Sequence, residues 1–256
     1  MLVDAHCHLD DEQFGDDLDA VVARAVDAGV VAIVTAGGDV ASSQVAVALA
    51  EKYEQVYAAV GIHPHHAASF GETALKEIRA LAQHRKVVAI GEIGLDFHYA
   101  DGAPREVQER NLIAHLDLAE ELGKPVVIHD RDAHRAVMDI LRQRNGKPRG
   151  MLHCFSGDLE MARQAIDLGY LISFAGNVTF SNARQLQAIA RAITLDRILI
   201  ETDAPYLSPK RGRRNEPANV AEVAAKIAEL MGVEESVVAT TTAQNSKRLF
   251  GFRTME

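Results

Sequence analysis

Short runs of apolar, largely β-branched residues recur along the chain, and longer stretches with helical periodicity separate them. Runs of this length between turn signals are typical of buried strands in a parallel sheet. We predict such strands in residues 1–6, 30–38, 56–64, 87–96, 125–132, 150–157, 170–177 and 197–205. The pattern therefore predicts eight strands.

The stretches between the strands have apolar residues at helical spacing. We predict helices in residues 18–28, 42–53, 73–84, 106–122, 133–144, 159–168 and 183–193. Gly29, Gly123 and Gly169 follow three of them, as glycine often follows a helix. Strands that alternate with helices indicate parallel βαβ units, and eight such units fit a (β/α)₈ barrel (TIM barrel), for which about 250 residues is typical.

An open doubly wound sheet is the alternative, but no glycine-rich phosphate loop follows the first strand. Residues 218–232 and 234–251 predict two further helices, which we expect to close the barrel. No linker rich in proline, glycine or serine precedes them. We therefore expect one domain over residues 1–256.

Composition narrows the function classes. The hydrophobic fraction of 48% and the charged fraction of 25% are those of an ordinary soluble protein. No leader pattern opens the chain and no apolar run is long enough for a membrane span, so we expect a cytoplasmic protein with no membrane partner. The formal net charge of −9 disfavours a broad basic surface for duplex nucleic acid. It still allows a small anionic group in one locally positive cleft.

Polar residues at the predicted strand ends carry the chemical information, because a core strand should otherwise be apolar and barrel active sites lie at the carboxyl ends of the strands. Six of the eight strands end in a metal-ligand type or an acid. These residues are His6, His8, His63, Glu92, His129, His153 and Asp203.

Strand geometry predicts which of these side chains converge. Alternation puts His6 and His8 on one face and Cys7 on the other. Alone, this pair fits two hydrogen-bonded core histidines equally well. Alternation also places Arg131 on the face of His129, nearer the mouth. It predicts that Cys7 and Cys154 both face the helices, without a disulfide.

The whole set predicts a metal site, because several imidazoles and carboxylates aimed at one point would repel each other without a cation. Four histidines and two carboxylates exceed the three protein ligands of a typical catalytic zinc, so we expect two divalent ions. Nitrogen and oxygen donors are compatible with Zn²⁺, Mn²⁺, Co²⁺, Ni²⁺ or Mg²⁺.

Several motifs together resemble the TatD family of metal-dependent hydrolases, a branch of the amidohydrolase-type barrels. They are "DAHCHLD", "GIHPH", "GEIGLDFH", "PVVIHDRDA", "LHCFSG", "ETDAPYL" and the closing "TTTAQNSKRLF". The resemblance runs in order over essentially the whole chain. It implies a deoxyribonuclease that cleaves phosphodiester bonds with a metal-activated water, as a 3′→5′ exonuclease on single-stranded DNA or DNA ends, with no obligate protein partner.

The resemblance also implies roles for single residues. His6 and His8 would hold one ion, with His129 and His153 on the other. Glu92 would bridge the two ions, and Asp203 would bind the first ion and act as the catalytic base. The resemblance places His63 and His65 towards the substrate phosphate, where Arg131 would add donors.

Two alternatives stay open. A two-ion site serves carbonyl centres as well, so an amidase or esterase activity, including removal of acyl groups from aminoacyl-tRNA, uses the same ligands. A barrel that only binds ligands would show gaps in the ligand set, and there are none.

The segment 208–217 follows the eighth strand, where barrels often bind phosphate, and it contains Lys210, Arg211, Arg213 and Arg214. It forms either a positive rim for DNA or a solvated loop.

Overall fold

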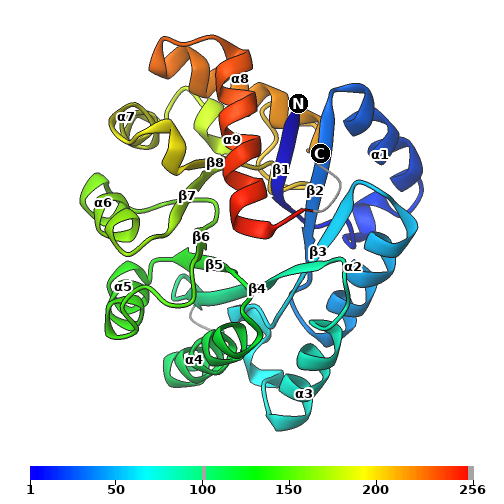
Figure 1. Ribbon diagram of the computed structural model, residues 1–256, viewed down its shortest axis with the longest axis vertical. Coiled ribbons are helices and arrows are strands. Elements are labelled where there is room, and N and C mark those ends of the chain that lie inside the picture. Colours follow the sequence, from blue (N-terminus) through cyan, green and yellow to red (C-terminus); the bar gives the residue numbers. More distant parts are fainter. Residues whose placement is uncertain (100–101, 253–256) are drawn as a thin grey trace.

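Eight parallel strands form one sheet in the order β1 to β8 in the computed structural model (Figure 1). The strands are β1 (Leu2–Cys7), β2 (Val30–Ala36), β3 (Val56–Val60), β4 (Val87–Asp96), β5 (Val126–Arg131), β6 (Gly150–Leu152), β7 (Leu171–Phe174) and β8 (Ile198–Ile200). The structure describes residues 1–99 and 102–252, so residues 100–101 and 253–256 of the expected domain lie outside the described residues.

The two edges of the sheet meet where β1 and the segment after β8 come together. The Asp203 amide donates to the His6 carbonyl over 3.0 Å, and the His8 amide donates to the Ala204 carbonyl over 2.7 Å. These bonds join the first strand to the last. The (β/α)₈ prediction is therefore confirmed, and the open doubly wound sheet is wrong.

Helices follow the strands and surround the barrel (Figure 1). They are α1 (Leu18–Asp27), α2 (Val40–Lys52), α3 (Glu72–Leu81), α4 (Arg105–Leu122), α5 (His134–Gln143), α6 (Leu159–Asp167), α7 (Arg184–Ala192), α8 (Val220–Met231) and α9 (Glu235–Phe250). Short 3₁₀ segments, which the pattern did not predict, are η1 (Glu12–Phe14), η2 (Pro64–Ser69), η3 (Gly176–Thr179), η4 (Leu195–Arg197) and η5 (Pro217–Asn219).

Local chemistry sets several helix ends. The Asp39 carboxylate accepts from the Ser42 amide over 2.8 Å and caps the start of α2. Asp158 does the same for α6 through the Met161 amide. Gly123 ends α4 with a φ of 64°, a left-handed conformation that glycine adopts without a steric cost.

The core has two layers. The inner layer fills the barrel and includes Val3, Ala32, Val34, Tyr57, Val127, Met151 and Leu199. Ala243 and Phe250 of α9 and the following Phe252 belong to the same cluster, so α9 closes the amino-terminal end of the barrel, across which it lies in Figure 1.

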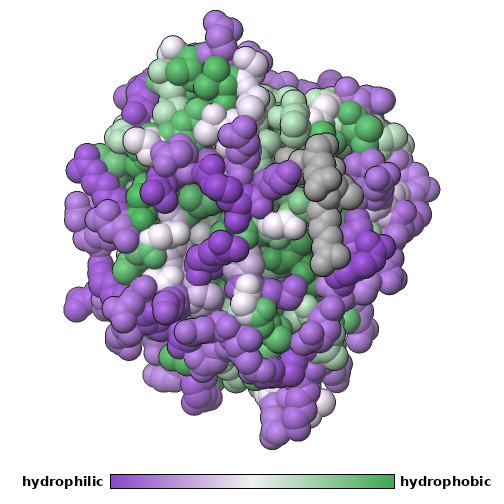
Figure 2. Space-filling view, in the orientation of Figure 1, coloured by the Kyte–Doolittle hydropathy of each residue, from purple (hydrophilic) through white to green (hydrophobic). Residues whose placement is uncertain are grey.

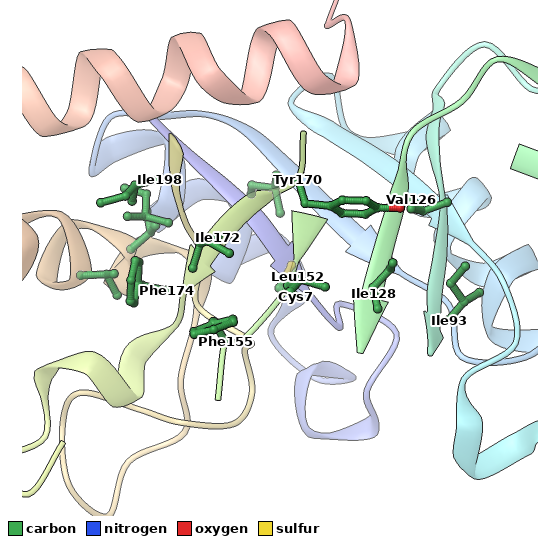
Figure 3. Packing of buried hydrophobic residues seen from close by; sticks show 14 of the residues in the cluster. Cys7, Ile93, Val126, Ile128, Leu152, Phe155, Tyr170, Ile172, Phe174 and Ile198 are labelled. Atoms are coloured by element: carbon green, nitrogen blue, oxygen red, sulfur yellow. The ribbon is translucent and has the colours of Figure 1, made fainter. Parts of the chain in front are cut away.

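The outer layer lies between the strands and the surrounding helices. Figure 3 shows part of it, with Ile128, Ile172 and Phe174 on the strands and Phe155 close by. Burying a side chain of this size stabilises the fold by about 1.5–3 kcal/mol. The two layers therefore fix the barrel that carries the strand ends.

The face of the molecule shown in Figure 2 is mostly polar at its periphery. This is the face that α9 covers. Within the described part of the chain, none of the helices combines the length and the apolar character that crossing a membrane requires.

Candidate metal centre

The polar strand ends meet in one cleft at the carboxyl ends of the strands. The cleft has a volume of about 790 Å³, and its lining includes His8, His63, Glu92, His129, His153 and Asp203. His6 is fully buried beneath it. The structure thus brings together all seven strand-end residues that the sequence singled out.

One oxygen of Glu92 contacts three imidazoles. Glu92 Oε1 lies 2.8 Å from His129 Nδ1, 2.8 Å from His153 Nε2 and 3.3 Å from His63 Nε2. The Glu92 side chain is only 3% exposed. Glu92 Oε1 therefore faces one set of imidazoles and leaves Oε2 for a second set.

The other Glu92 oxygen faces the first strand. Glu92 Oε2 lies 3.4 Å from His6 Nε2 and 3.5 Å from His8 Nε2. Asp203 Oδ1 lies 3.6 Å and 3.5 Å from the same two nitrogens. Asp203 has a φ of 56°, a strained conformation of the kind found at functional sites.

The donor atoms suit divalent cations. Three overlapping groups, His6–His8–Asp203, His6–Glu92–His153 and His63–Glu92–His129, each place their ligand atoms within 4.8 Å of one another. Two nitrogen pairs approach closely, His6 Nε2 to His8 Nε2 at 3.2 Å and His129 Nδ1 to His153 Nε2 at 3.3 Å. At these distances both nitrogens of a pair can donate their lone pairs to one cation.

The electrostatics keep both carboxylates charged. Burial raises the pKa of Glu92, but His153, His63 and His6 outweigh burial and hold this pKa well below its usual value. The pKa of Asp203 is likewise lowered, because the contact with His8 and the charges of His153 and His6 exceed the effect of burial. Both side chains are therefore available as anionic ligands at neutral pH.

The histidine pKa values diverge with the environment. Burial lowers the pKa of His8, but the contact with Asp203 and the charge of Glu92 raise it to about 9. Burial dominates at His63 and lowers its pKa to about 4. The carboxylates thus favour a positive charge at the position of His8, whereas His63 stays neutral at neutral pH.

Outer contacts orient the imidazoles. Asp96 Oδ2 lies 3.1 Å from His129 Nε2, so His129 turns its Nδ1 towards Glu92. The Ala36 carbonyl lies 3.3 Å from His8 Nδ1, which leaves Nε2 for the cluster. Such second partners fix the orientation of metal-binding histidines.

Glu201 supports His153 from below. Its oxygens accept from the Cys154 amide over 2.5 Å and from the Ser173 hydroxyl over 2.6 Å. Glu201 Oε1 also lies 3.5 Å from His153 Nδ1. Glu201 is fully buried, so it holds this part of the cluster rigidly.

The sequence prediction missed Asp96 and gave Asp4 no role in the site. Asp96 ends β4 at an even spacing from Glu92, which is the signal that could have identified it. Asp4 is fully buried and accepts from the Thr202 amide over 2.8 Å and from its hydroxyl over 2.6 Å. An acid inside an apolar strand was the signal in that case, and the contact fixes the segment that carries Asp203.

The expected substrate contacts lie at different depths. His63 belongs to the cluster, with its Nε2 beside Glu92. His65 lies outside the cluster. Its Nε2 is 2.8 Å from Asp96 Oδ2, and its side chain is 43% exposed. Arg131 is exposed at the rim and donates to the Tyr99 hydroxyl over 3.3 Å.

The two cysteines behave differently. Cys7 is buried in the outer layer of the core, as predicted. The prediction for Cys154 is wrong, because β6 ends at Leu152 and Cys154 has a φ of 42°, so strand alternation no longer applies. Cys154 lines the cleft instead, and burial raises the pKa of its thiol well above the usual value. Both thiols are free.

The basic segment 208–217 does not reach the cleft, since none of its four cations lines it. Arg214 pairs with Asp17 over 2.8 Å, and Lys210 donates to Asn219 over 3.1 Å. Two of the four cations are therefore engaged in holding the loop.

Comparisons with known proteins agree with this geometry. The family model for TatD related DNase matches residues 3–251. An uncharacterized metal-dependent hydrolase, YabD of Bacillus subtilis, is 42% identical over 98% of this chain and 99% of its own length. The 3′-5′ ssDNA/RNA exonuclease TatD of Escherichia coli is 38% identical over 98% and 99%.

A solved structure has the same fold. The TatD homolog YJJV from Escherichia coli superimposes with a TM-score of 0.92 at 32% identity and covers 98% of both chains. The family model and these relatives span nearly all of the sequence. The chain therefore belongs to the TatD-related DNase family.

Proposed function

We propose that the protein is a metal-dependent hydrolase that cleaves the phosphodiester bonds of DNA and removes nucleotides in the 3′→5′ direction. The main support is the position of Glu92, whose two buried oxygens each face a separate set of imidazoles. Relatives named as metal-dependent hydrolases and as a 3′-5′ ssDNA/RNA exonuclease support the choice of metal chemistry and of phosphodiester substrate.

The donor groups divide naturally between two ions. His6, His8 and Asp203 would hold the first ion, His129 and His153 the second, and Glu92 would contact both. Where bound, the ions supply Lewis acids for phosphoryl oxygens and lower the pKa of a water molecule towards neutrality.

The remaining steps use side chains of the protein. Asp203, kept anionic by the histidines around it, accepts a proton as the general base through the carboxylate oxygen that does not face His6 and His8. Arg131 stands at the rim with donors for a phosphate oxygen, a charge-assisted contact. His63 and His65 complete the phosphate contacts, while Asp96 and Glu201 hold the imidazoles in place.

Cleavage of a single-stranded DNA oligonucleotide with a 5′ label tests the proposal. With divalent metal present, we expect a ladder that shortens one nucleotide at a time from the 3′ end. A matched panel of an aryl ester, an anilide and an aminoacyl-tRNA tests the carbonyl alternatives. Hydrolysis of the panel without any cleavage of DNA would refute the proposal.

A further inference from the structure

We propose that Tyr99 and Tyr206 form a pair of stacking platforms on the rim of the cleft, which select an unpaired nucleotide at the 3′ end of the substrate. The inference rests on the proposed function and adds two residues that would contact the substrate bases. It starts from two aromatic rings that are 49% and 50% exposed, although they line the cleft that holds the metal centre.

Tyr99 stands beside the second half of the cluster. Its ring meets that of His65 edge-on, with centroids 5.2 Å apart, and His65 contacts Asp96 below. The Arg131 guanidinium carbon lies 5.2 Å from the Tyr99 centroid, and Arg131 also donates to the Tyr99 hydroxyl. The ring is thus held by neighbours while half of its area faces solvent.

Tyr206 stands beside the first half. Its ring meets that of His8 with centroids 6.1 Å apart. The Tyr206 hydroxyl donates to the Asp11 carboxylate over 2.7 Å, which fixes the ring orientation. The two tyrosines therefore flank the metal centre, Tyr206 beside His8 of the cluster and Tyr99 beside His65, which contacts Asp96 next to the cluster.

The charges around the cleft determine what such rings can bind. Among the described residues, the lining contains four carboxylates outside the metal centre and its immediate support, namely Asp10, Asp11, Asp39 and Asp130. Arg131 is the one lysine or arginine that the described lining includes. Phosphates that flank the cleaved bond would therefore meet negative charge. A basic track, which is how many proteins follow a nucleic-acid backbone, is missing from this lining.

Affinity beyond the contacts to the cleaved phosphate must then come from the bases. Stacking of a base on an aromatic side chain contributes about 1–3 kcal/mol and tolerates any sequence. A base can stack on an exposed tyrosine only when it has left its own duplex stack. The arrangement consequently favours a single-stranded or frayed 3′ end over a paired one.

Kinetics with two substrates test this inference. Tyr99→Ala and Tyr206→Ala should each raise the KM for a single-stranded DNA oligonucleotide by about 5–150-fold, the equivalent of one lost stacking contact. The KM for methyl 4-nitrophenyl phosphate, a diester without a base, should change little. Tyr99→Phe and Tyr206→Phe keep the rings but lose the hydroxyl contacts, and as matched controls they should raise the KM for DNA much less than the alanine variants.

Binding without turnover separates this inference from the proposed function. Fluorescence anisotropy of a labelled oligonucleotide, measured in an Asp203→Asn background, should show the same loss of affinity in the alanine variants and a shallow salt dependence. Unchanged affinity in both alanine variants, or a slope that indicates many phosphate contacts, would overturn the stacking platforms even if DNA is cleaved. Wild-type protein that cleaves no diester would refute the proposed function, while the anisotropy result would still decide for or against the platforms.

Discussion

The two ends of the barrel are equally buried and chemically opposite. At the carboxyl end, His6, Glu92 and His153 are at most 5% exposed, yet all three are polar. At the amino end, Phe250 and Phe252 of the α9 region are as deeply buried and wholly apolar. Buried residues therefore stabilise the fold by packing at the amino end, whereas at the carboxyl end they bring ligand atoms together. The same contrast is typical of (β/α)₈ barrels.

The difference has an energetic side. His6 Nδ1 is buried without a hydrogen-bond partner among the described residues. Such an atom costs about 1–3 kcal/mol. The apolar end and the outer core layer offset this cost, so variants at the two ends should separate catalysis from stability.

The largest expected effect is on kcat and concerns Asp203 at the mouth of the cleft. Asp203→Asn keeps the size of the side chain but removes the proton acceptor, and it should lower kcat for DNA cleavage by about 10²–10⁴-fold. Steady-state kinetics at saturating metal measure this. Asp132→Asn is the matched control, because Asp132 is exposed and pairs with His98 outside the cluster. Equal rates for wild type and Asp203→Asn would remove Asp203 from the mechanism.

At the opposite end, Phe250→Ala should cost about 3–5 kcal/mol of unfolding free energy, because it leaves a cavity under α9. Urea denaturation measures this cost. The rate per folded molecule should stay at the wild-type value. A loss of kcat comparable to that of Asp203→Asn would show that the two ends are not separable.

A third variant probes the helical shell, where His115 of α4 is fully buried. Burial lowers its pKa to about 4, so the unfolded chain takes up a proton at higher pH than the folded protein. Stability that is present above about pH 6.5 should therefore be lost as the pH falls towards 4, by up to about 3 kcal/mol. His115→Gln should flatten this part of the urea-midpoint profile; an unaltered profile would contradict the assignment.

The smallest expected effect concerns support of the cluster. Glu201→Gln preserves the shape but removes the charge beside His153, and it should weaken metal affinity or activity by about 10–100-fold. Metal titration followed by activity measures it. Glu216→Gln, which breaks a carboxylate contact to Arg24 outside the mouth, should leave both values at wild type.

Much of this architecture could be predicted from the sequence, because alternation of strands and helices depends on local patterns. Strand parity predicted that His6 and His8 converge, and their Nε2 atoms lie 3.2 Å apart, although His8 follows the last residue of β1. Parity failed at Cys154, where the chain has already left β6. Strand alternation also cannot predict the direction of the His63 side chain, because His63 lies beyond the end of β3 and caps η2.

The detailed contacts of Glu92 were beyond sequence reasoning. Register shifts interrupt β1 between Asp4 and Cys7 and β4 between Ile90 and Ile93. Such irregularities rotate side chains relative to a regular strand. Which imidazole faces which carboxylate oxygen therefore depends on the tertiary structure.

Metal stoichiometry tests the central claim most directly. Elemental analysis of purified wild-type protein, after equilibration with Mn²⁺ or Zn²⁺ and removal of free metal, should give two ions per chain. Glu92→Ala should bind fewer ions and lose DNA cleavage while keeping its circular dichroism spectrum. Wild-type protein that retains no divalent metal, or a Glu92→Ala variant with full metal content and full activity, would contradict a two-ion centre built around Glu92.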